Sequence, residues 1–480
     1  MTGAPQEPRS PQSTGDWLSV WTAGKTAIHL GNVAEYGEQL LPARPANQPL
    51  SAAPLDTQHR LRAARDYSGL AWFYSPEPRL VLFPGPVEPE WGEWLKDLLE
   101  WSHCEAYSDL AADEEAIGHA IIQRKTLLKR IKQQVNPLIA WGHTPDYQQL
   151  LASTGQQGPA SLSSKADSTS LQRAIRTYED KHQANELFRT VVQHHPGVRV
   201  PRQWHFEHAT MGMATALWRA RCGHALVCKT LQGAGGSGVT ILSPAHIRAA
   251  GGNLRALAQL RASLSTTGSS TSLILEEYID PAGNYHDITV DAIIDNEANV
   301  HIVGAGLMHV SGTAYQGVTV GPGSVPPRLA ATAIAFTRDV GRALADVGHR
   351  GWFDIDFVVS RKGELCPTET NCRLTGPAVA FMIAARLAQT RRKDFVVRTL
   401  DAVPLALPLR SAPLHALLRR VHAYCAALHV QLLPTLVGRA QAERPSVGLA
   451  LAGQDRQAVE VGTTLVTGLL ADPQQLMPFC

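Results

Sequence analysis

The 480-residue chain has few cysteines and no cluster of them that suggests a metal finger. Its seven cysteines are scattered, and no two form a CxxC pair. An odd number of dispersed thiols does not suggest a disulfide framework, so the sequence predicts reduced cysteines, as in cytoplasmic proteins. A strong charge of either sign is also missing, because 44 basic residues face 42 acidic ones for a net charge of +2. That balance provides neither the basic footprint of a nucleic-acid binder nor a polybasic membrane patch.

Long apolar runs are absent as well. No stretch of about 18 apolar residues occurs, so no membrane-spanning helix is expected. Residues 1–16 are polar and proline-rich and lack the apolar core of a signal peptide, which predicts a disordered lead. We therefore expect a cytoplasmic protein with neither a membrane nor a nucleic-acid partner.

The length and the segment pattern predict several domains. Residues 17–165 alternate apolar strands with helices, as in RLVLFPGP followed by WGEWLKDLLEW, which predicts an α/β domain with a parallel sheet. A Ser- and Gly-rich stretch at 154–170 leads into a central α/β region, residues 166–400, whose two parts meet near residue 275. The proline-rich stretch DAVPLALPLRSAP begins a small C-terminal α/β domain, residues 401–480.

A glycine-rich loop lies between two expected strands in HALVCKTLQGAGGSGVTIL. Gly233, Gly235 and Gly238 fit the pattern G-x-G-x-x-G, but no helix pattern follows and no acid stands about 20 residues further on, so a Rossmann site is disfavoured. A strand ending at Lys229, a glycine loop and a second strand instead predict a hairpin whose tip can fold over a triphosphate. Glycine backbone N–H groups can approach phosphate oxygens closely. A plain glycine hairpin with a solvated lysine is the alternative.

The stretch LILEEYIDPAGNYHDITVDAIID places two glutamates at the end of an apolar strand. A nucleotide base needs backbone donors and acceptors at its edge and apolar side chains on its face. Residues 276–279 can supply both, with Glu276 accepting a hydrogen bond from the adenine amino group. His286 opens the next strand, where it can bind a ribose hydroxyl. An exposed strand-start histidine is the alternative for His286, and a solvated edge carboxylate is the alternative for Glu277.

Two strands joined by a turn are expected in GWFDIDFVVSRKGELCPTETNCRLTGP, residues 351–377. Side chains alternate between the two faces of a strand. In the first strand Asp354 and Asp356 therefore share one face, and the other face is apolar. It consists of Phe353, Ile355, Phe357 and Val359. Two acids on a strand otherwise fit for a core need a partner, because a buried unpaired charge costs several kcal/mol.

The second strand of this pair supplies that partner. Glu369, Asn371 and Arg373 stand at positions i, i+2 and i+4 and are expected on one face. Cys366 and Cys372 have the opposite parity and are expected to point into the core. The oxygen-bearing side chains, and not the thiols, are therefore the candidates for chemistry.

Carboxylate and amide oxygens suit a hard cation. Mg²⁺ binds to one or two carboxylates and completes its octahedron with water and substrate phosphates, which makes a nucleotide triphosphate the natural further ligand. Asp356 and Glu369 would bind the metal, Asn371 would add a neutral oxygen, and Arg373 could neutralise charge that develops on an acyl phosphate. Asp354 is not counted as a ligand. An inter-strand ion cluster is the alternative.

Taken in chain order, these parts resemble the ATP-grasp superfamily. They are a helix lysine (Lys181 in EDKHQANELF), the strand lysine Lys229 with its glycine loop, the hinge EEYI, and the strands F-D-I-D-F and E-T-N-C-R. In outline the chain is similar to ATP-grasp peptide ligases of natural-product pathways, such as the pheganomycin-type peptide ligase. This resemblance implies an α/β (α+β) ATP-grasp fold, with a pre-ATP-grasp α/β domain in front and a small α/β domain behind.

The resemblance also implies which residues contact each ligand. Implied contacts to ATP come from the helix, the glycine loop and the hinge, namely Lys181, Lys229, Gly235, Gly236, Ser237, Glu276, Tyr278, Ile279 and His286. Asp356, Glu369 and Asn371 are implied as ligands of two Mg²⁺ ions, and Arg373 and Lys229 as catalytic residues. His286 stands where many relatives have Glu.

The implied activity is the ATP-dependent joining of a carboxylate to an amine, on amino acids or peptides in a biosynthetic pathway. ATP phosphorylates the carboxylate, and the amine attacks the acyl phosphate to give an amide, ADP and phosphate. This chemistry asks mainly for positioning and charge neutralisation, which agrees with a sequence that shows no nucleophile or triad. A homodimer is compatible with this assignment. An ATP-grasp carboxylase or phosphotransferase, and a nucleotide-binding protein without catalysis, are the alternatives.

A further stretch, residues 308–327, is rich in Gly, Ser and Thr. It predicts a loop that borders the acceptor site and could act as a lid. An ordinary surface connection is the alternative. His309 and Arg328 are candidates there for holding a substrate carboxylate.

Overall fold

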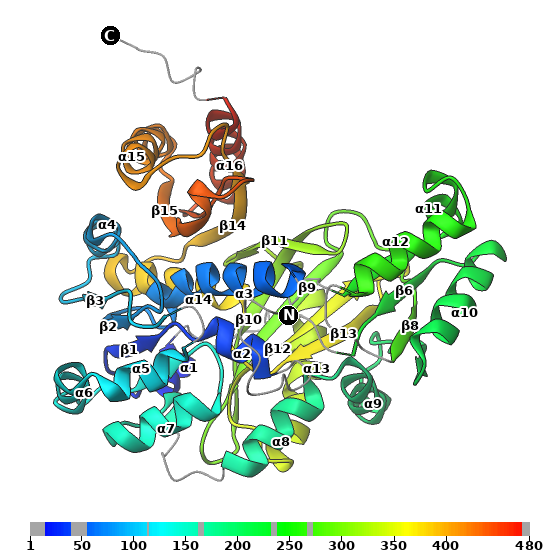
Figure 1. Ribbon diagram of the computed structural model, residues 1–480, viewed down its shortest axis with the longest axis horizontal. Helices are drawn as coiled ribbons and strands as arrows, with labels where there is room; N and C mark the ends of the chain where they lie inside the picture. The colour runs from blue at the N-terminus through cyan, green and yellow to red at the C-terminus, as the bar shows by residue number, and fades with distance from the viewer. Residues whose placement is uncertain are drawn as a thin grey trace, which may run out of the picture.

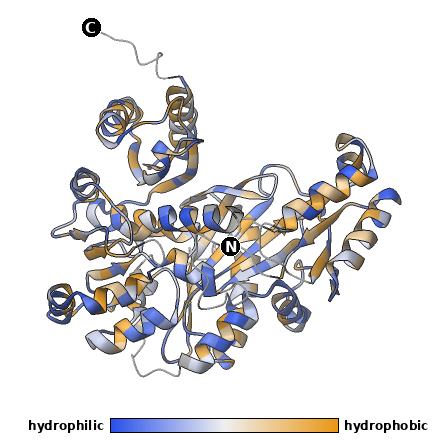
Figure 2. Cartoon of the chain, viewed as in Figure 1, coloured by the Kyte–Doolittle hydropathy of each residue, from blue (hydrophilic) through white to orange (hydrophobic). Residues whose placement is uncertain are grey.

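The computed structural model describes residues 15–39, 55–112, 115–161, 168–231, 238–265 and 272–472. The predicted disordered lead falls on residues that lie almost entirely outside these ranges. Among the described residues the strands form three sheets, with helices packed around them (Figure 1). Apolar residues concentrate on the strands and on the inner sides of the helices (Figure 2). None of the described helices combines the length and the apolar character needed to cross a membrane.

The N-terminal sheet is four-stranded, and its order is β3-β2-β1-β4. The strands are β1 (Ala27–Leu30), β2 (Pro78–Leu82), β3 (Glu105–Tyr107) and β4 (Leu138–Ala140). All pairings are parallel, as the sequence predicted. The accompanying helices are α1 (Gly15–Thr22), α2 (Val33–Gln39), α3 (Leu55–Tyr67), α4 (Pro89–Leu99), α5 (Ile117–Gln123), α6 (Lys125–Lys132) and α7 (Pro145–Thr154), with 3₁₀ turns η2 (Ser68–Phe73) and η3 (Pro159–Ser161).

Helix α7 shows why the local sequence folds as expected. The Thr144 side chain caps its start by accepting a hydrogen bond from the backbone N–H of Tyr147, and a proline follows at the first helical position. The helix ends at Gly155, whose φ of 72° is the left-handed conformation that glycine adopts without strain.

The central sheet is eight-stranded and antiparallel, in the order β13-β12-β9-β10-β11-β14-β16-β15. Its strands are β9 (Asp287–Ile294), β10 (Val300–Ser311), β11 (Ala314–Val320), β12 (Gly351–Val359), β13 (Leu365–Asn371), β14 (Val396–Pro404), β15 (Gln431–Leu436) and β16 (Ser446–Gly453). Its helices are α13 (Pro327–Asp346), α14 (Gly376–Arg391), α15 (Ser411–Ala427) and α16 (Arg456–Ala471), with the 3₁₀ turn η5 (Gly438–Gln441). The apolar face of β12 packs against α13, where Phe353 and Phe357 meet Phe336 in one buried cluster.

The third sheet has the order β5-β8-β6-β7 and lies to one side of the central sheet (Figure 1). Its strands are β5 (Gln203–Phe206), β6 (Leu226–Lys229), β7 (Val239–Leu242) and β8 (Leu273–Glu277), and the helices around it are α10 (Ala209–Arg221), α11 (Pro244–Ala249) and α12 (Asn253–Ser265). Helices α8 (Ser168–Tyr178) and α9 (Lys181–Val191), with the 3₁₀ turn η4 (Val192–His194), precede it. Lys229 ends β6 opposite Val239 of β7, so the predicted strand–lysine–loop–strand hairpin is present.

The C-terminal segment continues the central sheet. The boundary expected at residue 401 falls inside β14, which pairs with β11 on one side and with β16 on the other. Pro404 ends this strand, Pro408 lies in the connection to α15, and Pro413 lies in the first turn of that helix. The proline-rich composition therefore marks the end of an element and not a break between folded units.

The loop predicted over residues 308–327 is wrong for most of its length, because β10 and β11 form an antiparallel hairpin there. Two of its glycines, Gly317 and Gly321, are required by close packing against a neighbouring chain segment. Gly317 has a φ of +141°, and a Cβ on it would stand 2.0 Å from the carbonyl oxygen of Thr399. A Cβ on Gly321 would stand 2.2 Å from the carbonyl oxygen of Phe395. A glycine-rich composition can therefore reflect either a flexible loop or close packing within a sheet, and a single sequence does not distinguish these two causes.

Candidate active site

The acids predicted on two strands share one face of the β12–β13 pair. Asp354 lies opposite Asn371, and Asp356 lies opposite Glu369. Residues directly opposite in an antiparallel pair point to the same side with Cβ atoms about 5 Å apart. The predicted convergence of oxygen-bearing side chains is therefore present in the strand register.

The expectation for the two cysteines is wrong for Cys366. After Asp356 pairs with Glu369, Phe357 pairs with Pro367, so Thr368 is an extra residue that forms a β-bulge. The bulge shifts the alternation and puts Cys366 opposite Val358, on the same side as Asp356. Both thiols are still buried, and burial raises the pKa of Cys366 to about 11. A thiol with so high a pKa is a poor nucleophile.

Asp356 offers an oxygen that nothing in the described chain satisfies. Its Oδ1 atom is buried and makes no hydrogen bond to the described residues. Burial and the nearby carboxylates of Asp354 and Glu369 raise its pKa well above the usual range. An orphaned buried carboxylate of this kind fits a bound cation. Asp356, Glu369 and Asn371 are the residues that would hold Mg²⁺.

The described side chains do not form a complete metal cage. Within those ranges, no three His, Cys, Asp or Glu residues gather as a metal-binding group. Two carboxylates and an amide leave most positions of an octahedral ion to water and to substrate oxygens, which is how Mg²⁺ is held beside nucleotide phosphates. The donor set thus fits the ion only together with a phosphorylated ligand.

Two buried lysines approach the acids from different elements. Lys181, at the start of α9, has its Nζ 3.0 Å from Oε2 of Glu369. Lys229, at the end of β6, has its Nζ 2.6 Å from Oε1 of Glu276 and donates to the carbonyl oxygen of Thr368 at 3.4 Å. Burial alone would raise the pKa of Glu369, but the charges of Lys181 and Lys229 outweigh it and lower that pKa. The two cations predicted to bind ATP therefore lie at the acid cluster.

The predicted hinge follows β8. Glu276 is buried, and besides Lys229 it accepts a hydrogen bond from Nε2 of Gln203 at 3.2 Å. Tyr278 is half-buried and Ile279 is buried directly beyond the strand. Glu277 is not simply solvated, because Arg199 pairs with it at 2.9 Å.

Arg199 also connects the hinge to the central sheet. Its Nε atom lies 3.2 Å from the carboxylate of Glu364, one residue before β13. The strand that carries Glu369 is therefore tied to the strand that carries Glu276.

Two further predictions have different outcomes. His286 precedes β9 by one residue, its ring is 38% exposed, and its Nδ1 lies 2.7 Å from Oδ2 of Asp287. Its contact with a ribose stays a prediction. Gly235, Gly236 and Ser237 lie outside the described residues.

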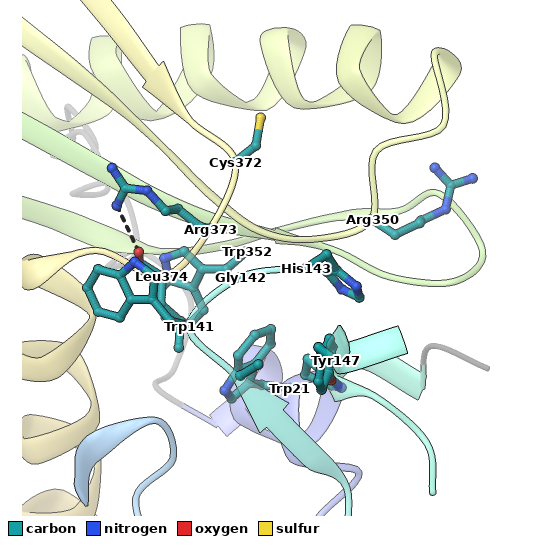
Figure 3. A pocket seen from close by; sticks show the side chains of 13 residues that line it. Trp21, Trp141, Gly142, His143, Tyr147, Arg350, Trp352, Cys372, Arg373 and Leu374 are labelled. Atoms are coloured by element: carbon teal, nitrogen blue, oxygen red, sulfur yellow. Dashed lines mark hydrogen bonds between the residues drawn. The ribbon is translucent and has the colours of Figure 1, made fainter. Parts of the chain in front are cut away.

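Arg373 lies at the meeting point of the N-terminal region and the acid cluster. Its Nη2 donates to Oδ1 of Asn371 at 2.9 Å, and its Nη1 donates to the carbonyl oxygen of Leu374 at 3.0 Å (Figure 3). Its guanidinium also stands 5.7 Å from the ring centres of both Tyr36 and Trp141. A cavity of about 20 Å³, with room for one water molecule, lies beside it. Figure 3 shows the Cys372 side chain leaving the strand away from the Trp141 ring.

The sequence analysis missed the carboxylate that holds Arg373. Glu179 is buried, and its Oε1 lies 3.7 Å from Nε of Arg373. The same oxygen accepts hydrogen bonds from the Tyr36 hydroxyl and from the Cys372 backbone N–H, both at 2.8 Å. The available signal was weak: Glu179 stands two residues before Lys181, at the start of the helix that the motif identified.

Asp354 orients the neighbouring amide. Its Oδ1 accepts from Nδ2 of Asn371 at 2.8 Å, and its Oδ2 accepts from the Thr375 hydroxyl at 2.6 Å. Burial raises the pKa of Asp354 to about 6, although these two hydrogen bonds oppose the shift. With Asn371 Nδ2 bound in this way, the amide oxygen is turned toward Arg373.

Removing the Glu179 carboxylate is expected to destabilise the fold. Glu179→Ala leaves the buried Arg373 guanidinium without its nearest carboxylate, which typically lowers the free energy of unfolding by about 3 kcal/mol. Urea-induced unfolding followed by tryptophan fluorescence measures this change. Glu93→Ala is the control, because Glu93 is 69% exposed in its pair with Lys96 and its loss should cost under about 1 kcal/mol. Equal stability of the two variants would contradict the prediction.

Comparisons with known proteins relate this geometry to others. No family model matches the chain. Over 149 residues, 31% of this chain, it is 29% identical to the L-propargylglycine–L-glutamate ligase of Streptantibioticus cattleyicolor. The match spans 29% of that protein's length.

Two solved structures share most of the architecture. One is the biotin carboxylase domain of the Hydrogenobacter thermophilus 2-oxoglutarate carboxylase, a dimer in complex with MgADP, ADP and bicarbonate. Its TM-score is 0.52 at 10% identity, and the match covers 96% of this chain and 95% of that chain. Carboxyaminoimidazole ribonucleotide synthase from Aspergillus clavatus, in complex with ATP, has a TM-score of 0.50 and 13% identity over 83% of this chain and 100% of that chain. At these identities the likeness concerns the fold alone.

Proposed function

We propose that this chain, which has the ATP-grasp fold that its motifs predicted, is an ATP-dependent carboxylate–amine ligase. The observation that carries the proposal is the convergence at β12 and β13. Lys181 of α9 contacts Glu369, which lies opposite Asp356. Lys229 of β6 pairs with Glu276 and donates to the carbonyl oxygen of Thr368, next to Glu369, and Arg373 lies beside this cluster. Buried cations and acids in one place suit a ligand that is itself a metal-bound polyanion.

The charges suggest how the first step proceeds. Lys181 and Lys229 would bind the phosphates of ATP while a carboxylate oxygen of the substrate attacks the γ-phosphorus, and ADP leaves. The product is an acyl phosphate. Arg373 has five N–H groups. One donates to Leu374, one donates to Asn371 and one faces Glu179. The other two would donate to the reacting oxygens.

Asp356, Glu369 and Asn371 would hold Mg²⁺, and the predicted two ions would need phosphate oxygens of the nucleotide to complete their ligands. The metal would neutralise phosphate charge. In support, one structural relative is described with MgADP. Arg199, Glu277 and Glu364 would keep the hinge aligned with this site.

The second step would join the acyl group to an amine. The amine nitrogen attacks the carbonyl carbon, the bond to the phosphate oxygen breaks, and phosphate takes up a proton. We propose amino acids or peptides as both substrates, supported by the name of the partial sequence relative, a ligase of two amino acids. A homodimer is proposed as well, since one structural relative is a dimer.

The names of the structural relatives favour a second candidate, the carboxylation of an amine or acid with bicarbonate. One experiment separates the alternatives. The chain is incubated with MgATP and pairs of the common amino acids, or with single amino acids and bicarbonate, and ADP and new masses are recorded. Ligation predicts an amide together with stoichiometric ADP. A carboxylated product would establish the alternative, and the absence of ADP release with every pair would contradict catalysis on these substrates.

A further inference from the structure

One carboxylate that shares a pair of aromatic neighbours with Arg373, Asp401, has no part in the chemistry described so far. Asp401 lies on β14, in a stretch where Leu400 pairs with Leu449 but Val403 pairs with Val447, so Asp401 and Ala402 form a β-bulge. Bulges in strands beside active sites re-aim side chains. The Tyr67 hydroxyl donates to Oδ2 of Asp401 at 2.6 Å. Its Oδ1 makes no hydrogen bond to a described residue, and the side chain is partly exposed.

Aromatic contacts connect Asp401 to the proposed reaction site. The Tyr67 ring packs edge-on against Trp141 with ring centroids 5.7 Å apart, and Arg373 stands 5.7 Å from the centre of the same Trp141 ring. Asp401 and Arg373 are therefore both neighbours of one aromatic pair. They come from β14 and from the end of β13, which are far apart in the order of the sheet.

A second polar group without a partner lies in the same place. The hydroxyl of Tyr315 on β11 is buried and makes no hydrogen bond to a described residue. It borders Gly376, where a Cβ would stand 2.8 Å from it, and Gly376 follows Arg373 by three residues. Strands β11 and β14 are neighbours in the sheet, and a Cβ on Gly317, two residues after Tyr315, would stand 2.0 Å from the carbonyl oxygen of Thr399, two residues before Asp401. Tyr315 and Asp401 therefore lie in the same stretch of this strand pair, and the charge of Asp401 raises the pKa of Tyr315.

The negative charge of Asp401 is uncompensated. In the part of the chain that the structure describes, the polar partner of Asp401 is the Tyr67 hydroxyl and not a cation. Burial raises its pKa to about 6 even though the Tyr67 hydrogen bond opposes the shift. A buried carboxylate without a cationic partner destabilises the fold unless a bound ligand supplies the positive charge. The remaining oxygen of Asp401, Oδ1, and the Tyr315 hydroxyl match an alkylammonium ion, which donates three hydrogen bonds.

We infer that Asp401, with Tyr315, binds the ammonium group of the amine substrate and accepts one of its protons. The inference rests on the proposed function. It specifies that one substrate is a primary amine that binds in its protonated, ammonium form. In the step, R–NH₃⁺ gives a proton to the Asp401 carboxylate and becomes R–NH₂. Its lone pair then attacks the acyl phosphate, the C–N bond forms, the C–O bond to phosphorus breaks, and the phosphate leaves with the electron pair and the second proton. Tyr67 acts as a positioning residue that fixes Oδ2.

Hydroxylamine provides the test, because it is largely uncharged at neutral pH and traps acyl phosphates as hydroxamates without needing an ammonium site. Asp401→Asn is expected to lower kcat/KM for the amine about 100-fold in the amide assay, with hydroxamate formation and the KM for ATP unchanged within about twofold. Tyr67→Phe is expected to lower kcat/KM for the amine about tenfold. Asp394→Asn, at an exposed position before β14, is the matched control and should behave as the wild type.

Three outcomes decide the inference. Amine kcat/KM within threefold of the wild type in Asp401→Asn would overturn it. A parallel loss of hydroxamate and amide would also overturn it, because the variant would then act through the site as a whole. Since Asp401→Asn removes an uncompensated charge, its thermal unfolding midpoint should equal or exceed that of the wild type, and a lower midpoint would indicate a structural role. A wild-type chain that forms no hydroxamate with any amino acid would instead contradict the proposed function itself.

Discussion

Glu369→Gln is expected to reduce kcat of the ligase reaction about a thousandfold, which corresponds to about 4 kcal/mol of transition-state stabilisation. The glutamine has the shape of the glutamate but not its charge, so it weakens the metal site opposite Asp356 and leaves Lys181 without the carboxylate that lies 3.0 Å from its Nζ. Release of ADP with a productive substrate pair measures the effect over a range of Mg²⁺ concentrations, and the Mg²⁺ needed for half-maximal rate should rise.

The control for this prediction is Glu297→Gln, in the exposed turn between β9 and β10. It should turn over at the wild-type rate with the wild-type Mg²⁺ dependence. Full turnover of Glu369→Gln at ordinary Mg²⁺ concentrations would show that the metal ligands have been assigned to the wrong residues.

Arg373→Ala is expected to reduce kcat by a factor of 10² to 10³, the range typical for loss of a group that stabilises developing negative charge. The geometry gives the reason, because Asn371, Glu179 and two aromatic rings fix the guanidinium beside the acid cluster. Arg373→Lys keeps one positive charge but cannot contact Asn371 and Leu374 at the same time. It is therefore also expected to be slow, with a loss of about 10²-fold.

Binding of MgATP separates a catalytic role of Arg373 from a folding defect. Lys181 and Lys229 are intact in Arg373→Lys, so titration with MgATP should give a Kd close to that of the wild type. Hydroxamate formation should fall as much as amide formation, because Arg373 would act on the acyl phosphate that both reactions share. A lysine variant with wild-type kcat would show that a point charge is sufficient at this position.

The proposals for Asp401 and Arg373 divide the reaction between two sides of one aromatic pair. Arg373 would act on the carboxylate half and Asp401 on the amine half, with Tyr67 and Trp141 between them. Tyr67 and Trp141 come from the N-terminal region and Asp401 from β14. Substrate choice would therefore depend on segments outside the recognisable motifs, which explains why the motifs identify the chemistry and not the substrates.

Local periodicity was sufficient to predict the polar faces of β12 and β13. Acids at i and i+2 in β12, and the E-x-N-x-R spacing in β13, each fix a shared face because side chains alternate along a strand. An antiparallel hairpin then brings the two polar faces together, so Asp356 and Glu369 could be paired without coordinates. The same reasoning failed at Cys366, because the bulge at Thr368 inserts one residue into the alternation and leaves no mark in composition.

The sequence by itself determined the parts of this protein whose signal is local: the parallel N-terminal sheet, the lysine before the glycine loop, and the polar faces of β12 and β13. Tertiary structure decided what depends on contact between distant segments. Glu179 meets Arg373 across 194 positions of chain, and Tyr67 meets Asp401 across 334. No helix or strand periodicity relates residues so far apart in the chain. Their side chains come into contact because the N-terminal region packs against the central sheet.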